Sequence, residues 1–262
     1  MDLGLQGKSA LVVASSTGLG RAVAVGFGRE GARVTLFARS KESLEEAARE
    51  VEGAGGEANP VVGDLTDPAT IDTVLRSAHD RFGGVDILVT NSGGPPPGFF
   101  PDLSEESWET AFDSLLLSVV RLVRGTVPSM KEKSWGRIVC LVSVSVKQPI
   151  GNLVLSNSIR PGVVGLAKSL SGELGPQGIT VNCVAPGFTR TGRLDELAAH
   201  RAKSEGTTPE EIYRTWESTV PVGRLGKPEE LADLVLFLAS KRAGYLNGLT
   251  IPFDGGSYRG LM

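Results

Sequence analysis

A serine and an arginine one helical turn apart are the first groups in this chain that could contact a substrate. The stretch LSNSIRPGVVGLAKSL, residues 155–170, reads as a helix and places Ser156 and Arg160 on one face of it. Ser143 precedes Ser156 by 13 positions and follows an apolar run. Hydroxyl and guanidinium groups donate hydrogen bonds to a carbonyl oxygen or an anion, but neither is an acid near neutral pH.

A glycine turn is the second feature with chemical meaning. ASSTGLG, residues 14–20, follows an apolar run and opens a helical pattern. Gly18 and Gly20 leave the backbone amides at the head of that helix uncovered, and such amides bind a diphosphate. Close packing of helix on strand is the alternative explanation. The strand-turn-helix context favours a nucleotide site.

The end of the second apolar run indicates which dinucleotide would bind. An acidic residue there would bond an unphosphorylated ribose and repel a 2′-phosphate, but the chain has Arg39, Ser40 and Lys41. Arg39 offers a planar fork suited to a phosphate. We therefore expect NADP(H) rather than NAD(H), although Lys41 reads equally well as a surface charge.

Strands and helices alternate along the chain. Short runs rich in Val, Leu and Ile alternate with helical patterns of ten residues or more, which predicts right-handed βαβ units in a parallel sheet covered on both faces. The helix caps expected include Ser40, and Asp67 followed by Pro68. The expected strands are residues 9–14, 33–38, 57–65, 85–91, 136–144, 178–186 and 249–256, and the expected helices are 18–31, 40–56, 67–84, 104–133, 155–170 and 228–240.

The fold expected is therefore an α/β doubly wound parallel sheet of the Rossmann type, in a single domain covering residues 1–262. The one long stretch without a clear pattern is residues 188–224, rich in Thr, Arg and Glu. A segment of that length in a compact domain is more often functional than a plain connection, so we expect a lid over the substrate.

Composition excludes several other classes of protein. Of the 262 residues, 40% are hydrophobic and 22% are charged, and the net charge of −3 comes without a basic stripe, so we expect no nucleic-acid partner. No apolar run is long enough to span a membrane, and no signal peptide is evident. Cys140 and Cys183 lie in apolar runs and read as buried thiols, and no metal-binding spacing occurs. The expectation is a cytoplasmic protein without a metal.

Five motifs in order resemble those of the short-chain dehydrogenase/reductase family, and the likeness runs almost end to end. The family pattern Thr-Gly-x-x-x-Gly-x-Gly falls on residues 13–20 and matches its last two glycines but not the first. The Asp after strand three falls on Asp64, and Asn-Asn-Ala-Gly falls on residues 90–93 with two matches. Pro-Gly-x-x-x-Thr matches residues 186–191 in full, and Asp-Gly-Gly matches residues 254–256.

The resemblance, together with the turn and Arg39, assigns a set of residues to the dinucleotide. They are Ser15, Ser16, Thr17, Gly18, Leu19, Gly20, Arg39, Ser40, Asp64, Leu65, Asn91, Gly93, Arg160, Pro186, Gly187 and Thr191.

The catalytic positions depart from the family pattern. The family uses Asn, Ser, Tyr and Lys, and those positions hold Leu115, Ser143, Ser156 and Arg160. The resemblance makes Ser143, Ser156 and Arg160 the catalytic candidates, with Ser145 as the neighbour that could be mistaken for Ser143. A serine hydroxyl is a much weaker acid than a phenol and is shorter, so the family's proton transfer cannot run through these groups.

Two other proton donors are open. Lys147 lies four residues after Ser143, and Tyr213 lies in the expected lid, although a surface charge and a packing aromatic are the plainer interpretations. Residues 90–100, TNSGGPPPGFF, form a stiff loop whose two phenylalanines either line an apolar substrate pocket or pack on the protein itself.

Three functions stay open from the sequence. The first is an NADP(H)-dependent oxidoreductase that interconverts a carbonyl and an alcohol of a small-molecule substrate with a non-standard proton donor. The second is a catalytically silent nucleotide-binding scaffold or sensor. The third is a cofactor-independent lyase of the halohydrin dehalogenase type, in which a polar cluster of Ser143, Ser156, Asn157, Ser158 and Arg160 binds the ligand. The resemblance also implies a homo-oligomer, a tetramer or dimer formed through the long helix and the next one.

Overall fold

A seven-stranded, all-parallel sheet forms the centre of the molecule. We describe residues 1–261 of a computed structural model. The strands lie in the order β3-β2-β1-β4-β5-β6-β7. Their bounds are β1 Ser9–Val13, β2 Arg33–Ala38, β3 Glu57–Val62, β4 Ile87–Thr90, β5 Gly136–Leu141, β6 Ile179–Pro186 and β7 Thr250–Phe253. The α/β doubly wound fold expected from the sequence is confirmed; Met262 lies outside the described residues.

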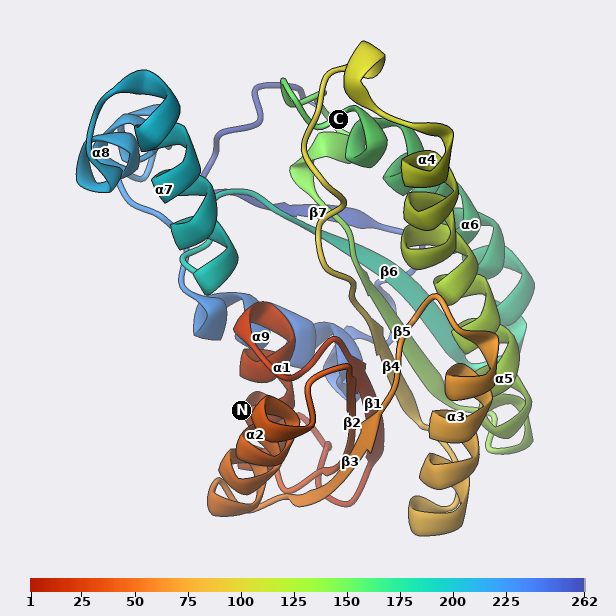
Figure 1. Ribbon diagram of the computed structural model, residues 1–262. Coiled ribbons are helices and arrows are strands. Elements are labelled where there is room, and N and C mark those ends of the chain that lie inside the picture. Colours follow the sequence, from red (N-terminus) through yellow and green to blue (C-terminus); the bar gives the residue numbers. More distant parts are fainter. Residues whose placement is uncertain (262) are drawn as a thin grey trace.

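Helices cover both faces of this sheet (Figure 1). One layer is α1 Gly18–Arg29, α2 Lys41–Gly53 and α9 Pro228–Ala239. The other layer is α3 Pro68–Phe82, α4 Glu105–Phe112, α5 Ser118–Glu132 and α6 Val154–Leu174. Successive β1 side chains point to opposite layers, so Val12 joins the core under α1 and α9 while Leu11 joins the core under α3, α5 and α6.

Local signals start the helices where the sequence places them. Asp67 caps α3 by accepting a hydrogen bond from the Ala69 N–H at 2.9 Å, and Gly83 ends the helix with φ of +74°. Ser40 caps α2 from its hydroxyl oxygen. The long helix expected at 104–133 is present as α4 and α5, joined by a π-helical turn, Asp113–Leu117.

The segment 188–224 is not irregular, which corrects the sequence expectation. It contains two helices, α7 Gly192–Glu205 and α8 Pro209–Thr219, that project from the carboxyl edge of the sheet (Figure 1). They share a small apolar core of their own, in which Phe188 stacks on Trp216 with ring centroids 5.2 Å apart. Their polar composition hides this pattern, because each helix buries only one narrow face.

The cysteines and the hydrophobicity of the helices were also considered from the sequence. Cys140 and Cys183 are buried, unpaired and face each other across β5 and β6. Within residues 1–261, no helix is both long enough and apolar enough to cross a bilayer.

Candidate active site

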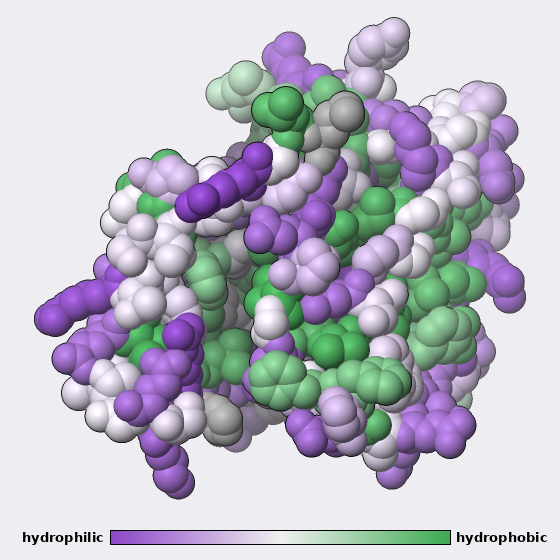
Figure 2. Space-filling view, turned by 90° about the horizontal axis from the view of Figure 1, so that it is seen from above, coloured by the Kyte–Doolittle hydropathy of each residue, from purple (hydrophilic) through white to green (hydrophobic). Residues whose placement is uncertain are grey.

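The carboxyl ends of β1 and β4 form the crevice in which a doubly wound sheet binds its ligand. β1 pairs with β2 on one side and β4 on the other, so the connections leave this point in opposite directions. α1 starts here, directly after β1. Seen from above, the molecule is hollowed between the part formed by α7 and α8 and the rest of the domain (Figure 2).

The glycine turn is held in a shape that excludes side chains. A Cβ at Gly20 would lie 2.2 Å from the Ala14 carbonyl oxygen, so only glycine fits there. Gly18 has φ of +56° and Ala14 has φ of +50°. The alanine at the family's first glycine position thus adopts the left-handed conformation that a glycine would adopt without strain.

Three segments distant in the sequence converge on this turn. The Ser15 hydroxyl is buried and accepts a hydrogen bond from the Phe37 N–H at 3.1 Å, which ties the turn to β2. The Asn91 amide donates to the Ala14 carbonyl at 3.5 Å. The Thr191 methyl group lies 3.6 Å from where a Gly18 Cβ would be. The predicted motifs after β1, β4 and β6 therefore meet at one place.

Other assigned residues lie beside this junction or farther along the edge. Ser16 and Leu19 are half-buried, and Thr17 is the exposed residue before α1. Gly93 is exposed in the loop after β4. Pro186 ends β6, and a Cβ at Gly187 would lie 2.8 Å from the Asp254 Cβ, so the segments after β6 and β7 are in close contact.

The end of the crevice beside β2 and β3 carries Arg39 and Asp64. The Arg39 side chain is 82% exposed, and its Nη1 lies 3.9 Å from the Asp64 carboxylate. Partial burial would raise the pKa of Asp64, but hydrogen bonds from Thr66 and the charge of Arg39 outweigh it and lower the pKa. Ser40 is occupied as the α2 cap, and Leu65 is half-buried against the core. Arg39 is therefore free to turn toward a phosphate.

Three serines and one arginine form the catalytic corner, which we define as Ser143, Ser145, Ser156 and Arg160. The Ser143 oxygen accepts a hydrogen bond from the Ser145 N–H at 3.1 Å, and among the described residues nothing accepts the Ser143 hydroxyl proton. The hydroxyls of Ser145 and Ser156 are 3.1 Å apart, and both residues are buried. Ser156 is thus paired below the surface, while Ser143 is half-buried beside the crevice.

Arg160 is a buried cation with spare hydrogen-bonding capacity. The residue is 7% exposed, and its Nη1 donates to the carbonyls of Leu141 and Val142 at 3.5 and 3.3 Å. Its Nε is buried and has no partner within the described chain. Burial lowers the pKa of Arg160 to about 10, and the side chain still carries its charge at neutral pH.

The family's asparagine position is filled by an apolar contact. Leu115 is 2% exposed and packs with Ala111, Leu155 and Ile159 between α4 and α6. Leu115 lies in the π-helical turn Asp113–Leu117, which joins α4 to α5. Leu115 therefore contributes to apolar packing between α4 and α6 and offers no polar group there.

Asn157, Ser158 and Lys147 are the other polar residues considered from the sequence, and the structure places them in different surroundings. Asn157 bonds the backbone of Ile150 through both its amide atoms, at 3.1 and 2.8 Å, and Ser158 is exposed. The expected five-residue polar cluster therefore does not form. Lys147 is half-buried rather than a free surface charge; its backbone N–H donates to the Val144 carbonyl at 2.9 Å, and among residues 1–261 its side-chain amine has no hydrogen-bond or ion-pair partner.

Tyr213 is engaged within α7 and α8. Its hydroxyl donates to Asp195, its ring meets Trp216 edge to face, and the Arg190 guanidinium lies 5.0 Å from the ring centroid. Burial and the neighbouring Asp195 raise the pKa of Tyr213 to about 12, which makes it a weaker acid. The packing interpretation of this tyrosine fits these contacts.

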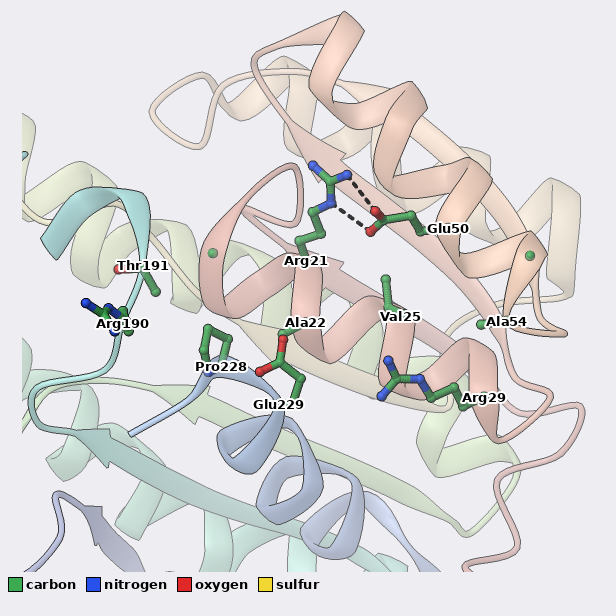
Figure 3. Close-up of a pocket in the computed structure, with 12 residues that line it drawn as sticks. Arg21, Ala22, Val25, Arg29, Glu50, Ala54, Arg190, Thr191, Pro228 and Glu229 are labelled. Carbon is green, nitrogen blue, oxygen red and sulfur yellow. Dashed lines mark hydrogen bonds and ion pairs between the residues drawn. The ribbon is translucent and has the colours of Figure 1, made fainter. Parts of the chain in front are cut away.

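A groove of about 740 Å³ runs from the glycine turn along the outside of α1. Thr191 and Arg190 lie at one end, and Arg29 lies at the other (Figure 3). Gly18 also lines the groove, next to Thr191. Arg21 spans it in a two-bond ion pair with Glu50, at 2.8 and 2.9 Å. The sequence analysis did not assign Arg190 to the site. Its position next to Thr191, in the matched motif at residues 186–191, could have pointed to it.

These residues fit a dinucleotide. The turn at Gly18 and Gly20 admits a diphosphate close to backbone amides, which no side chain obstructs. Arg39 is exposed and weakly paired just after β2. Arg160 has an unpartnered Nε at the catalytic corner, where the hydroxyls of a bound ribose would supply an acceptor.

Comparisons with known proteins agree with this geometry. A family model described as enoyl-(acyl carrier protein) reductase matches residues 13–258. The 3-oxoacyl-(acyl-carrier-protein) reductase FabG of Thermotoga maritima is 35% identical over 254 residues, which cover 96% of this chain and 98% of that protein. The corresponding FabG of Escherichia coli is 36% identical over 256 residues, covering 98% of this chain and 99% of that protein.

Solved structures match over the whole length. L-sorbose reductase from Gluconobacter frateurii, in complex with NADPH and L-sorbose, superposes with a TM-score of 0.95 at 34% identity and covers 100% of both chains. An actinorhodin polyketide ketoreductase with NADPH superposes with a TM-score of 0.92 at 31% identity and covers 97% of this chain and 98% of that one.

Proposed function

The chain belongs to the short-chain dehydrogenase/reductase family of oxidoreductases, and on that premise we propose that it is an NADP(H)-dependent enzyme acting on a carbonyl compound, with a proton donor other than the family tyrosine. The observation that carries this proposal is the glycine turn. Its amides are not covered by side chains, which suits a diphosphate, and it lies at the same carboxyl edge of the sheet as the half-buried Ser143.

The preference for NADP(H) rests on Arg39 and on the absence of an acid at the end of β2. A carboxylate there would repel a 2′-phosphate, whereas the exposed guanidinium of Arg39 attracts it. The relatives solved with NADPH agree with this choice.

Arg160 and Ser143 would bind and orient the ligands. When bound, the dinucleotide supplies hydride chemistry. Arg160 would bond the ribose on the nicotinamide side and hold a positive charge under the substrate. Ser143 would donate its hydroxyl proton in a hydrogen bond to the substrate oxygen and orient it. Carbonyl and alcohol would then be interconverted as in the family, except for the source of the proton.

Tyr213 and Lys147 are the two candidates for the proton donor. Tyr213 is bonded to Asp195 and its pKa is raised, so it is a poor candidate. Lys147 is half-buried and lies one short turn beyond Ser143, which makes it the side chain to test. Turnover of a panel of ketones and alcohols should fall in Lys147→Met if this amine is the donor.

Two experiments separate this function from its alternatives. Fluorescence titration with NADPH should show binding, whereas a chain that binds none would be left with the cofactor-independent lyase function. The double variant Ser156→Tyr with Arg160→Lys restores the family pair. If turnover appears only in that variant, the native chain is a silent nucleotide-binding scaffold; if native turnover exists and falls in Ser143→Ala, it is an enzyme.

We also propose a homo-oligomer, a dimer or tetramer formed through α4, α5 and α6. Phe112 on α4 is 45% exposed, and Gly165 and Gly172 on α6 have no neighbouring atoms within 4 Å of a Cβ position. The pair of unpaired, buried cysteines suits a reducing cytoplasm. Light scattering on the purified chain tests the assembly, and a monomer would contradict it.

A further inference from the structure

The glycine turn offers a diphosphate backbone amides but no full positive charge. Residues 14–20 contain no charged side chain. Arg21, the first cation after them, already faces two carboxylates of α2: Glu50 accepts two bonds from it at 2.8 and 2.9 Å, and Glu46 lies 3.5 Å away. We propose that Arg190 binds the diphosphate of the dinucleotide through its guanidinium and in this way holds α7 and α8 to the bound dinucleotide.

Arg190 lies beside the glycine turn, although the two are far apart in the sequence. The methyl group of Thr191, the next residue, is 3.6 Å from where a Gly18 Cβ would be. Arg190, Thr191 and Gly18 line the same groove, and Figure 3 shows the first two together at one end of it. A guanidinium carried on this segment is therefore at the end of the groove where an anion on the turn would lie.

The backbone at Arg190 is fixed, while the residue itself is exposed. Its N–H donates to the Gly226 carbonyl at 2.9 Å, and the Gly226 N–H donates to the Phe188 carbonyl at 3.0 Å. These bonds join the two ends of the α7–α8 arm, which we define as residues 188–224. Arg190 lines both the groove and a second pocket, of about 550 Å³, on the arm. Its side chain can therefore turn from one to the other without a change in the backbone.

The charge of Arg190 is not used in an ion pair. Arg193 and Arg224, two other arginines of the α7–α8 arm, are paired with carboxylates at 3.2 and 2.6 Å. Within residues 1–261, Arg190 has no such partner, and its guanidinium lies 5.0 Å from the centroid of the Tyr213 ring. An exposed cation–π contact is weak, whereas the two parallel bonds that a guanidinium donates to a phosphate are charge-assisted. Arg190 should therefore leave the Tyr213 ring for a diphosphate when one is bound.

This contact connects dinucleotide binding to the whole α7–α8 arm. α7 starts two residues after Arg190, and α8 packs on it through an apolar core that includes Trp216. The hydrogen bond from Tyr213 to Asp195 also joins the two helices. A bond from Arg190 to the diphosphate therefore holds both helices near the glycine turn.

The inference rests on the proposed function, because it needs a dinucleotide at the glycine turn, and its test separates the two. Binding of NADPH and NADH is measured by calorimetry, and binding of adenosine 2′-monophosphate by NMR titration. We expect Arg190→Gln to weaken NADPH and NADH alike by about 10- to 100-fold, from the loss of a charge-assisted contact. Adenosine 2′-monophosphate has no diphosphate, so its affinity should not change, which also shows that the variant is folded.

Arg193→Gln is the matched control, because Arg193 lies on the same arm, pairs with Glu196 and is not among the residues that line the groove. Arg190→Lys should bind both dinucleotides more tightly than Arg190→Gln, since it restores the charge without the planar fork. A loss confined to NADPH, native affinities in Arg190→Gln, or an equal loss in Arg193→Gln would overturn the inference and leave the proposed function standing. A native chain that binds neither dinucleotide would contradict the proposed function itself.

Hydrogen–deuterium exchange tests the link to the α7–α8 arm. With saturating NADPH, we expect the amides of α7 and α8 in the native chain to exchange about threefold more slowly, or slower still, than without it. In Arg190→Gln, at an NADPH concentration that saturates the variant, most of that slowing should be lost, while the slowing at the glycine turn remains. No slowing in α7 and α8 of the native chain, or equal slowing in both chains, would overturn the link.

Discussion

The glycine turn and the catalytic corner have both lost family residues, with opposite consequences. At the turn, alanine replaces the first glycine, yet the backbone of Ala14 keeps a left-handed φ of +50° and the amides stay uncovered. At the corner, Leu115 and Ser156 lie in helical backbone, but Ser156 lacks the acidic hydroxyl of the family's tyrosine.

The difference shows which kind of site tolerates substitution. A diphosphate is bound by backbone amides, so the turn works as long as its path is preserved, at a modest cost in strain. Proton transfer needs one side chain of suitable pKa at one place, and no arrangement of backbone replaces it. We therefore expect dinucleotide binding to tolerate the substitutions seen in this chain better than the family's proton transfer does.

The largest effect should come from adding a side chain inside the glycine turn. Gly20→Val would drive its Cβ into the Ala14 carbonyl, 2.2 Å away, so the turn must open. We expect NADPH affinity to fall by about a thousandfold or more, roughly 4 kcal/mol, by calorimetric titration. Gly53→Ala on α2 has open space around its Cβ position and is the control. Unchanged affinity in Gly20→Val would mean that the diphosphate binds elsewhere.

The next effect concerns Arg39. Arg39→Ala should weaken NADPH binding by about 10- to 100-fold, from the loss of a charge-assisted contact of roughly 1.5–3 kcal/mol, and leave NADH binding nearly unchanged. Lys41→Ala is the matched control, because Lys41 is exposed and pairs weakly with Glu45 at 3.9 Å. Equal losses for both dinucleotides would contradict the 2′-phosphate assignment.

The third prediction concerns the stability of the protein, because the buried charge of Arg160 should cost free energy when no dinucleotide is bound. Burial lowers the pKa of Arg160 to about 10 from its ordinary 12.5, so folding works against its charge at every pH below about 10, and this cost fades only as pH rises through that value. Arg160→Met should therefore raise the free energy of unfolding of the dinucleotide-free protein by about 1–3 kcal/mol in urea titrations. Saturating NADPH should reverse the order, because it stabilises the native chain more.

Arg137 is the control for that experiment. It is equally buried, at 5% exposed, but donates to the carbonyls of Gly136, Gly178 and Ser240 at 2.8–3.2 Å. Arg137→Met should lower the free energy of unfolding by about 2–4 kcal/mol, since it leaves carbonyls unpartnered. A loss of stability in Arg160→Met of the same size would show that Arg160 is structural.

The smallest effect tests the strain at the turn. Ala14→Gly should raise the free energy of unfolding by about 1 kcal/mol, because glycine adopts φ of +50° without the penalty that a Cβ brings. Ser134→Gly, at φ of +49° on the loop before β5, should give a similar gain. NADPH affinity should change little in either variant. A loss of stability in Ala14→Gly would mean that the unfolded chain's extra freedom outweighs the strain.

Much of the fold could be predicted because its signals are local. The order of strands and helices, the caps at Ser40 and Asp67, and the turn at residues 14–20 depend on neighbouring residues in the chain. The lid region could not be predicted in the same way. Each of α7 and α8 buries one narrow apolar face against the other helix. So few apolar positions per helix do not stand out in the sequence, and they form a core only when the two helices pack together.

The candidate site, like the fold, was predictable from the sequence only in part. The sequence by itself determined which groups are available: a glycine turn, an arginine at the end of β2, and no tyrosine or lysine in the family's places. Only the tertiary structure decided how they are paired: it joins Ser156 to Ser145, and within residues 1–261 it leaves the Ser143 hydroxyl proton and the buried Arg160 Nε without an acceptor. The reason is that burial and pairing depend on contacts between residues far apart in the chain, and those contacts exist only after the sheet and its helices have packed.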